Sequence, residues 1–285
     1  MKNLNPYRKN CFDIHKKAIS KKEDEQLRQR LSRLDDIIEK QFEHYSEKFE
    51  TNKLGEVSAE KEIAASKNDL LTLYSYQSSV IRAVRQEIED LQLKTIINTC
   101  QNCTVTPIST MDHVLPQSKF PEYVVNPRNL FPSCHICNGH KLISFPKGEE
   151  RFFLNLYLDA LPEKQYLFAK IWLDKDNEID FSFQLDNVNG VDEDLFKLIK
   201  SHYEKLNLFT RMKLKAIEGK GEFLNHIKEY AKELPIDTIQ KIEFKKINEA
   251  KAAYGFNHWK CVLEEALLTN PDFIKKITPS SSPNP

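Results

Sequence analysis

The sequence carries no net charge, because 42 Lys and Arg residues balance 42 Asp and Glu residues among its 285 positions. A strongly basic composition is the usual electrostatic signature of a protein that binds nucleic acid, and this chain lacks it. Any such binding is therefore expected from a local surface, or from chemistry that a bound metal ion makes possible.

Long apolar segments are missing as well. No window approaches the roughly 18 apolar residues that a membrane-spanning helix needs. The opening stretch, MKNLNPYRKNCFDIHKK, is polar and unlike a secretory signal. We therefore expect a soluble, cytoplasmic protein with no membrane partner. The chain also lacks a G-x-x-x-x-G-K-[ST] loop, so any ATP hydrolysis would come from another polypeptide.

Helical periodicity dominates the first third of the chain. Apolar residues recur at steps of three and four in EDEQLRQRLSRLDDIIEKQFEHYSEKF and again in NDLLTLYSYQSSVIRAVRQEIEDLQ. Each stretch has one apolar stripe to bury, so we predict two antiparallel helices. A short coiled coil or dimerisation arm is the alternative, and the oligomeric state stays open.

The last part of the chain mixes a hairpin with helices. YLFAKIWLDKDNEIDFSFQLD alternates around a polar turn and predicts a β-hairpin, and the pattern then becomes helical to about Ile277. The expected organisation is a helical region at 1–98, a motif region at 99–148, a hairpin with helices at 149–277 and a disordered tail at 278–285.

Four of the six cysteines form two matched pairs, Cys100-x2-Cys103 and Cys134-x2-Cys137. Two such turns supply the four thiolates that a closed, structural Zn²⁺ site prefers. A disulfide framework is not expected in a reducing compartment, and nothing nearby is typical of a redox motif. We predict a structural zinc site, with His135 pointing outward from the second turn.

Between the two pairs lie candidates for a second site. Asp112 and Asn138 offer the oxygen ligands that Mg²⁺ or Mn²⁺ accepts, and His113 has a side chain suited to proton transfer near neutral pH. A hard cation beside a general base is an arrangement suited to breaking a phosphodiester bond.

The pattern C-x2-C … DHVLPxS … NPxNLxPSCxxCNxxK resembles the HNH nucleases, which have a ββα-metal fold, over about 45 residues from Cys100. The resemblance implies that His113 is the general base, that Asp112 and Asn138 are metal ligands, and that Asn129 braces the loop that orients the base. Many members have His where Asn138 stands, so the chain resembles an HNN variant, with His140 as the alternative ligand. Contacts to phosphate are expected from Lys141, Arg128 and Lys119, although solvated surface charges are the simpler interpretation.

The expected fold is mainly α with a small ββα-metal (HNH) α+β nuclease insert that the four-cysteine zinc site holds together. Its first strand should end near His113, its second near Pro132, and its helix should begin near Asn138.

The expected function is that of a metal-dependent endonuclease acting on nucleic acid, with DNA as the first substrate and RNA as the alternative. The sequence is also similar to HNH effectors of Septu-type anti-phage systems, including those attached to retrons, which implies a separate ATPase partner. A non-catalytic zinc module that binds nucleic acid or protein is the rival hypothesis.

Overall fold

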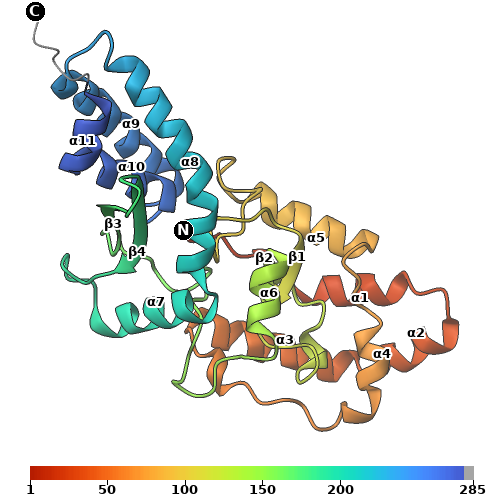
Figure 1. Ribbon diagram of the computed structural model, residues 1–285. Helices are drawn as coiled ribbons and strands as arrows, with labels where there is room; N and C mark the ends of the chain where they lie inside the picture. The colour runs from red at the N-terminus through yellow and green to blue at the C-terminus, as the bar shows by residue number, and fades with distance from the viewer. Residues whose placement is uncertain (279–285) are drawn as a thin grey trace, which may run out of the picture. The chain divides into compact units, whose positions relative to one another are not determined.

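A computed structural model describes residues 1–278 and divides the chain into two compact units. One unit spans Asn3–Leu161, here called the N-terminal unit; the other combines Met1–Lys2 with the chain from Pro162 onward and is called the C-terminal unit. Helices dominate both, and the described residues form two small two-stranded antiparallel sheets (Figure 1). This confirms the predicted mainly α class. Apart from Thr278, the predicted disordered tail lies outside the described residues.

Among residues 1–278, no helix is both long and apolar enough to cross a membrane.

The prediction of two long helices in the first third of the chain is wrong, because the structure has five shorter ones. They are α1 (Phe12–Ser20), α2 (Glu25–Ser32), α3 (Asp35–Glu50), α4 (Lys67–Leu71) and α5 (Ser79–Asp90). Polar caps cause two of the breaks: Asp24 accepts a hydrogen bond from the Leu27 N–H, and Ser78 accepts one from the Ile81 N–H. Such side chains compete with continuing helix and favour a helix start.

Helix α3 supplies the aromatic core on which the motif region rests. Its buried side chains are Ile38, Phe42, Tyr45 and Phe49. The ring of Tyr45 lies 4.9 Å from that of Tyr123, and both side chains are fully buried. This packing anchors the segment between the two cysteine pairs on the N-terminal helices.

The motif region has a strand–strand–helix order. Strands β1 (Thr110–His113) and β2 (Leu130–Ser133) pair antiparallel, with His113 opposite Leu130. Helix α6 (His135–Lys141) follows directly. The first strand ends at His113 as predicted. The helix begins three residues before the predicted Asn138, because the Cys134 sulfur caps it and accepts the Cys137 N–H at 3.4 Å.

The C-terminal unit contains the predicted hairpin. Strands β3 (Leu167–Leu173) and β4 (Ile179–Leu185) pair antiparallel along their whole length. Around them the chain forms α7 (Glu193–Lys205), α8 (Leu208–Tyr230), α9 (Ile236–Tyr254), α10 (Trp259–Thr269) and α11 (Pro271–Ile277). Helix α10 packs against β3, α8 and α9, so it forms the centre of this unit (Figure 1).

Candidate zinc centre and active site

The four paired cysteines meet in one buried cluster. Their sulfur atoms all lie within 4.8 Å of one another, and Cys103 Sγ is 3.9 Å from Cys134 Sγ. The first pair sits in a tight turn, in which the Cys103 and Thr104 N–H groups donate to the Cys100 carbonyl. The second pair straddles the start of α6. The predicted metal-binding cluster is therefore present, and its four thiol groups suit a zinc ion.

The electrostatics of the cluster favour a thiolate at Cys134. Hydrogen bonds from the neighbouring cysteine thiols and from the Cys137 N–H lower its pKa. Thiolates are the ligand form of cysteine, so this N–H is also a feature that would stabilise a bound metal. Cys11 and Cys261 lie outside the cluster and are buried as ordinary core residues, as expected.

Asp112 lies on β1, buried, and is paired with a cation from α6. The Lys141 ammonium is 3.0 Å from each oxygen of the Asp112 carboxylate and also donates to the His113 carbonyl. Burial raises the pKa of Asp112, and Lys141 opposes that shift. The Asp112 carboxylate on β1 is thus already paired with an ammonium group from the last turn of α6.

His113 is held in a single orientation at the end of the same strand. Its Nε2 lies 2.9 Å from the Val124 carbonyl oxygen, and the Tyr74 ring packs edge-on at 4.7 Å between centroids. A carbonyl oxygen only accepts, so Nε2 carries the proton and Nδ1 keeps its lone pair in the neutral ring. Burial, assisted by the Lys141 charge, lowers the pKa of His113 to about 4, so the ring is neutral at pH 7.

Asn129 braces the loop that follows His113. Its amide oxygen accepts from the Leu115 N–H at 2.7 Å and from the Tyr45 hydroxyl, while its amide nitrogen donates to the carbonyls of Leu115 and Tyr123. Its own backbone carbonyl accepts the Val114 N–H. The side chain is fully buried, so every one of these bonds replaces a bond to water. This fixes the chain on both sides of the imidazole.

Asn138 faces the strand that carries Asp112. Its amide nitrogen lies 3.5 Å from the Thr110 hydroxyl, and Thr110 and Asp112, two residues apart, project from the same face of β1. His140 and His135 are exposed on α6. Of the two candidate ligands after the last cysteine, Asn138 thus lies against the strand that carries Asp112, whereas His140 is exposed, and His135 is exposed as expected.

The other predicted phosphate contacts are placed differently. Arg128 is mostly buried: it pairs with Glu50 at 3.2 Å and donates to the Tyr7 carbonyl. The Lys119 ammonium is exposed and lies 4.7 Å from the centre of the Phe145 ring. Only Lys119 is thus displayed to solvent as a surface cation, because Lys141 and Arg128 are engaged within the N-terminal unit.

Sequence reasoning missed the residues that reach the site from distant segments. Tyr74 contacts the His113 ring and donates from its hydroxyl to the Met111 carbonyl at 3.4 Å. Tyr45 donates to Asn129 from α3. In the sequence both tyrosines appear only as members of helical apolar stripes, and no local signal separates them from core residues.

One curated protein is similar in sequence to part of this chain. The chain is 28% identical over 181 residues to Protein ea31 of Escherichia phage lambda, a match that covers 59% of this chain and 60% of that protein. The alignment therefore spans less than two thirds of the relative's length. No family model and no solved structure matches the chain.

Proposed function

We propose that this protein is a metal-dependent endonuclease of the HNH type, which hydrolyses phosphodiester bonds in nucleic acid. The observation that carries the proposal is the His113 imidazole, whose Nε2 is bonded to the Val124 carbonyl at the end of the strand that also carries the buried Asp112 carboxylate.

His113 is the general base. Nδ1 takes a proton from a water molecule as that water attacks phosphorus, while Nε2 keeps its hydrogen bond to Val124. The phosphorus bond to the leaving oxygen breaks, and the leaving oxygen is protonated from solvent. Tyr74 and Asn129 are positioning residues, because they touch the imidazole ring or its loop rather than the reacting atoms.

Asp112 and Asn138 are the residues that would hold Mg²⁺ or Mn²⁺. The Lys141 ammonium pairs with Asp112 and donates to the His113 carbonyl, which supports a site for positive charge at this position. Carboxylate and amide oxygens are the donors that these hard cations prefer. When bound, the metal would neutralise charge on the scissile phosphate and the leaving oxygen.

The cysteine cluster has a structural role in this proposal. Four thiolates complete a tetrahedral zinc site and leave no open position for water. The cluster joins the turn before β1 to the start of α6. It therefore fixes β1, which carries Asp112, and α6, which carries Asn138.

The preferred substrate is DNA, with RNA as the alternative, and the proposed setting is anti-phage defence beside a separate ATPase. This part rests on the resemblance to Septu-type effectors and on the missing ATP-binding loop. Co-expression with an ATPase encoded next to this chain should yield a complex on size-exclusion chromatography. Elution of the chain as a lone monomer would contradict the partnership without touching the nuclease proposal.

The test of the activity compares nucleic acids and metals in one experiment. The zinc-loaded protein, alone and with its ATPase partner, is incubated with supercoiled plasmid and with total RNA in Mg²⁺, Mn²⁺ or EDTA. We expect cleavage of the plasmid in metal and none in EDTA. Cleavage of RNA alone would reassign the substrate. Intact plasmid and RNA under all conditions, with zinc still bound, would contradict the proposal and favour a non-catalytic zinc module.

A further inference from the structure

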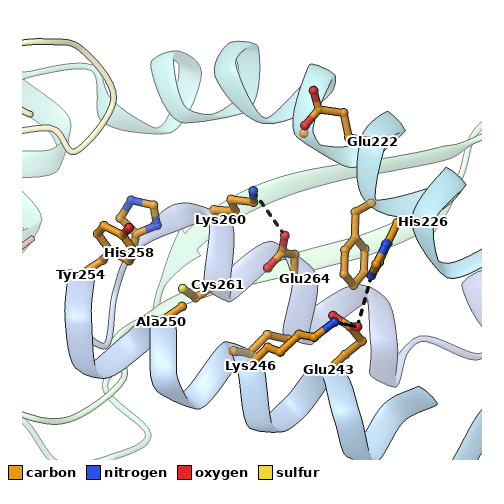
Figure 2. Close-up of a pocket in the computed structure, with 13 residues that line it drawn as sticks. Glu222, His226, Glu243, Lys246, Ala250, Tyr254, His258, Lys260, Cys261 and Glu264 are labelled. Carbon is orange, nitrogen blue, oxygen red and sulfur yellow. Dashed lines mark hydrogen bonds and ion pairs between the residues drawn. The ribbon is translucent and has the colours of Figure 1, made fainter. Parts of the chain in front are cut away.

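The C-terminal unit contains a pocket that the nuclease proposal does not use. It has a volume of about 470 Å³ and lies among α8, α9 and α10 (Figure 2). Gly219 and Ala250 contribute little side-chain volume to its lining. This volume lies in the range of small-molecule sites.

One side chain of the lining is a carboxylate whose negative charge is only weakly neutralised by a neighbouring cation. Glu264 on α10 is mostly buried, and the nearest basic group recorded for it is the Lys260 ammonium at 3.9 Å. Burial raises the pKa of Glu264 to about 7. A second carboxylate, Glu243, is already satisfied by Lys246 at 2.7 Å and by His226 at 3.2 Å. The Glu264 carboxylate can therefore accept hydrogen bonds from the N–H groups of a ligand.

The other part of the lining is aromatic and offers an unsatisfied ring nitrogen. His258 Nδ1 is buried without a hydrogen-bond partner. Its ring lies 5.3 Å from that of Tyr254, and Figure 2 shows the two together at one end of the pocket, with Lys260 and Glu264 nearer the middle. Burial lowers the pKa of His258 to about 3, so at neutral pH the ring offers neutral hydrogen-bonding nitrogens.

Positively charged groups lie at the mouth of the pocket. About half of each ammonium-bearing side chain of Lys246 and Lys260 is exposed, at 49% and 52%. The N-terminal ammonium of Met1, 3.3 Å from the Tyr254 carbonyl, is close enough to lower the pKa of His258. The pocket thus combines an inner acceptor, an aromatic end and cations that reach solvent.

Two simpler ligands fit this combination poorly. A divalent metal is not favoured, because Glu243 is already paired with Lys246 and His226, and no three His, Cys, Asp or Glu side chains of this pocket lie close enough to share an ion. A polyamine would pair with Glu264, but the lysines and the N-terminal ammonium would repel it and His258 would gain no matched partner.

We propose that this pocket binds a guanine nucleotide. The N1–H and 2-amino groups of guanine can both donate to the Glu264 carboxylate, whereas the corresponding edge of adenine presents a donor beside an acceptor. The base packs against the Tyr254 ring, and the phosphate lies toward Lys246, because the Lys260 ammonium lies beside the Glu264 carboxylate that holds the opposite edge of the nucleotide. The nucleotide would be a ligand of the C-terminal unit, separate from the nucleic acid proposed for the other unit.

Binding can be measured through a tryptophan next to the pocket. The chain has two tryptophans, and Trp259 stacks on His258 at 5.6 Å between ring centroids. In a Trp172→Phe background, the full-length, zinc-loaded protein is titrated with GMP, AMP, inorganic phosphate and spermidine, followed by Trp259 fluorescence and by calorimetry. We expect GMP to bind at least about tenfold more tightly than AMP, and phosphate and spermidine to give no saturation in the same range.

Single substitutions test whether the Glu264 carboxylate binds the guanine base. Glu264→Gln should weaken GMP binding by at least about tenfold, because its amide places a donor against the guanine donors. Glu249→Gln removes the same charge from an exposed position outside the pocket and should leave GMP binding unchanged. Lys246→Met should weaken the binding of GMP but not that of guanosine. Thermal melting checks that each variant is folded.

The proposal is overturned if GMP does not saturate at millimolar concentration, or if spermidine binds in its place. Equal GMP affinity in the folded Glu264→Gln variant would overturn it as well. If Glu264→Gln does not fold, the comparison of GMP with guanosine in the Lys246→Met variant tests the proposal.

Discussion

The two units of this protein place their functional side chains by different means. In the N-terminal unit, the strands that carry the candidate site have four residues each, and the connection between them is held by side chains bonded to backbone groups. In the C-terminal unit, the strands have seven residues each and α8 has 23. Regular helices there leave a pocket where they meet.

The difference predicts unequal tolerance to substitution. A polar loop held by specific bonds loses its geometry when one partner is removed, since the remaining buried groups stay unsatisfied. A helical unit distributes its stability over many apolar contacts, each of modest value. Four substitutions test the tolerance of the N-terminal unit.

The largest effect is expected from Cys134→Ser. It removes a zinc ligand and the cap of α6 together, and binding free energy in small zinc modules is folding free energy, on the order of 10 kcal/mol. We expect loss of bound zinc and unfolding around β1, β2 and α6, while the hairpin and helices of the C-terminal unit persist. Zinc analysis and hydrogen exchange by mass spectrometry would measure both.

Cys261→Ser is the matched control. Cys261 is also buried, but it lies in the C-terminal unit and outside the cluster. This variant should retain the wild-type zinc content. Zinc retention by Cys134→Ser, with unchanged exchange protection, would mean that the cluster does not hold the region together.

Asn129→Ala should cost about 2–4 kcal/mol of unfolding free energy. The substitution leaves the Leu115 N–H and the Leu115 carbonyl without their partner, and it removes one of two N–H donors to the Tyr123 carbonyl, which keeps the Asn126 N–H. Denaturant unfolding of the N-terminal unit, followed by near-ultraviolet circular dichroism, gives the difference. A loss below about 0.5 kcal/mol, the scale of ordinary surface substitutions, would contradict the bracing role.

His15→Phe should reduce the acid sensitivity of the N-terminal unit. Burial lowers the pKa of His15 from 6.5 to about 4, so between these values the unfolded chain binds a proton that the folded chain does not. Stability therefore falls as the pH drops through this window, by about 2 kcal/mol at pH 5 from this residue.

The phenylalanine would occupy a site between Phe12 and Phe42 and remove two unsatisfied ring nitrogens. Unfolding free energies of both proteins at pH 7 and pH 5 measure the effect of His15 together with that of Asp35, whose carboxylate lies 3.7 Å from His15 Nε2, because more distant titrating groups cancel in the comparison. Equal pH dependence in the two proteins would show that His15 is not a buried neutral imidazole.

Lys141→Met has the smallest predicted effect, and it sharpens the account of the metal site. Without the ammonium, Asp112 is left for an added cation, so Mn²⁺ should bind roughly tenfold more tightly, about 1.4 kcal/mol. Electron paramagnetic resonance of free Mn²⁺ measures this directly in the zinc-loaded protein. Unchanged or weaker binding would indicate that the cation position and the metal position differ.

Short-range patterns in the sequence were sufficient for part of this structure. The spacing within each cysteine pair predicted the cluster, because a single zinc ion prefers four thiolates and so brings the two pairs together. The alternation around Asp174–Asn177 predicted the hairpin, because its residues are close in the chain. The end of β1 at His113 was predicted for the same reason.

Contacts between distant segments could not be predicted. The pairing of Lys141 with Asp112, the packing of Tyr74 on His113 and the bond from Tyr45 to Asn129 each depend on how separate helices fold against the motif region. The break between α2 and α3 was missed because the apolar residues Leu31, Leu34 and Ile38 continue across it and no side chain caps the start of α3.

The most direct test of the central claim compares two histidine variants in the cleavage assay. His113→Ala removes the proposed base, whereas His135→Ala removes an exposed imidazole beside a zinc ligand. The account predicts that both variants keep zinc and fold, and that only His113→Ala loses metal-dependent cleavage, by at least about a hundredfold in rate. Cleavage by His113→Ala at the wild-type rate would contradict the assignment of His113 as the base.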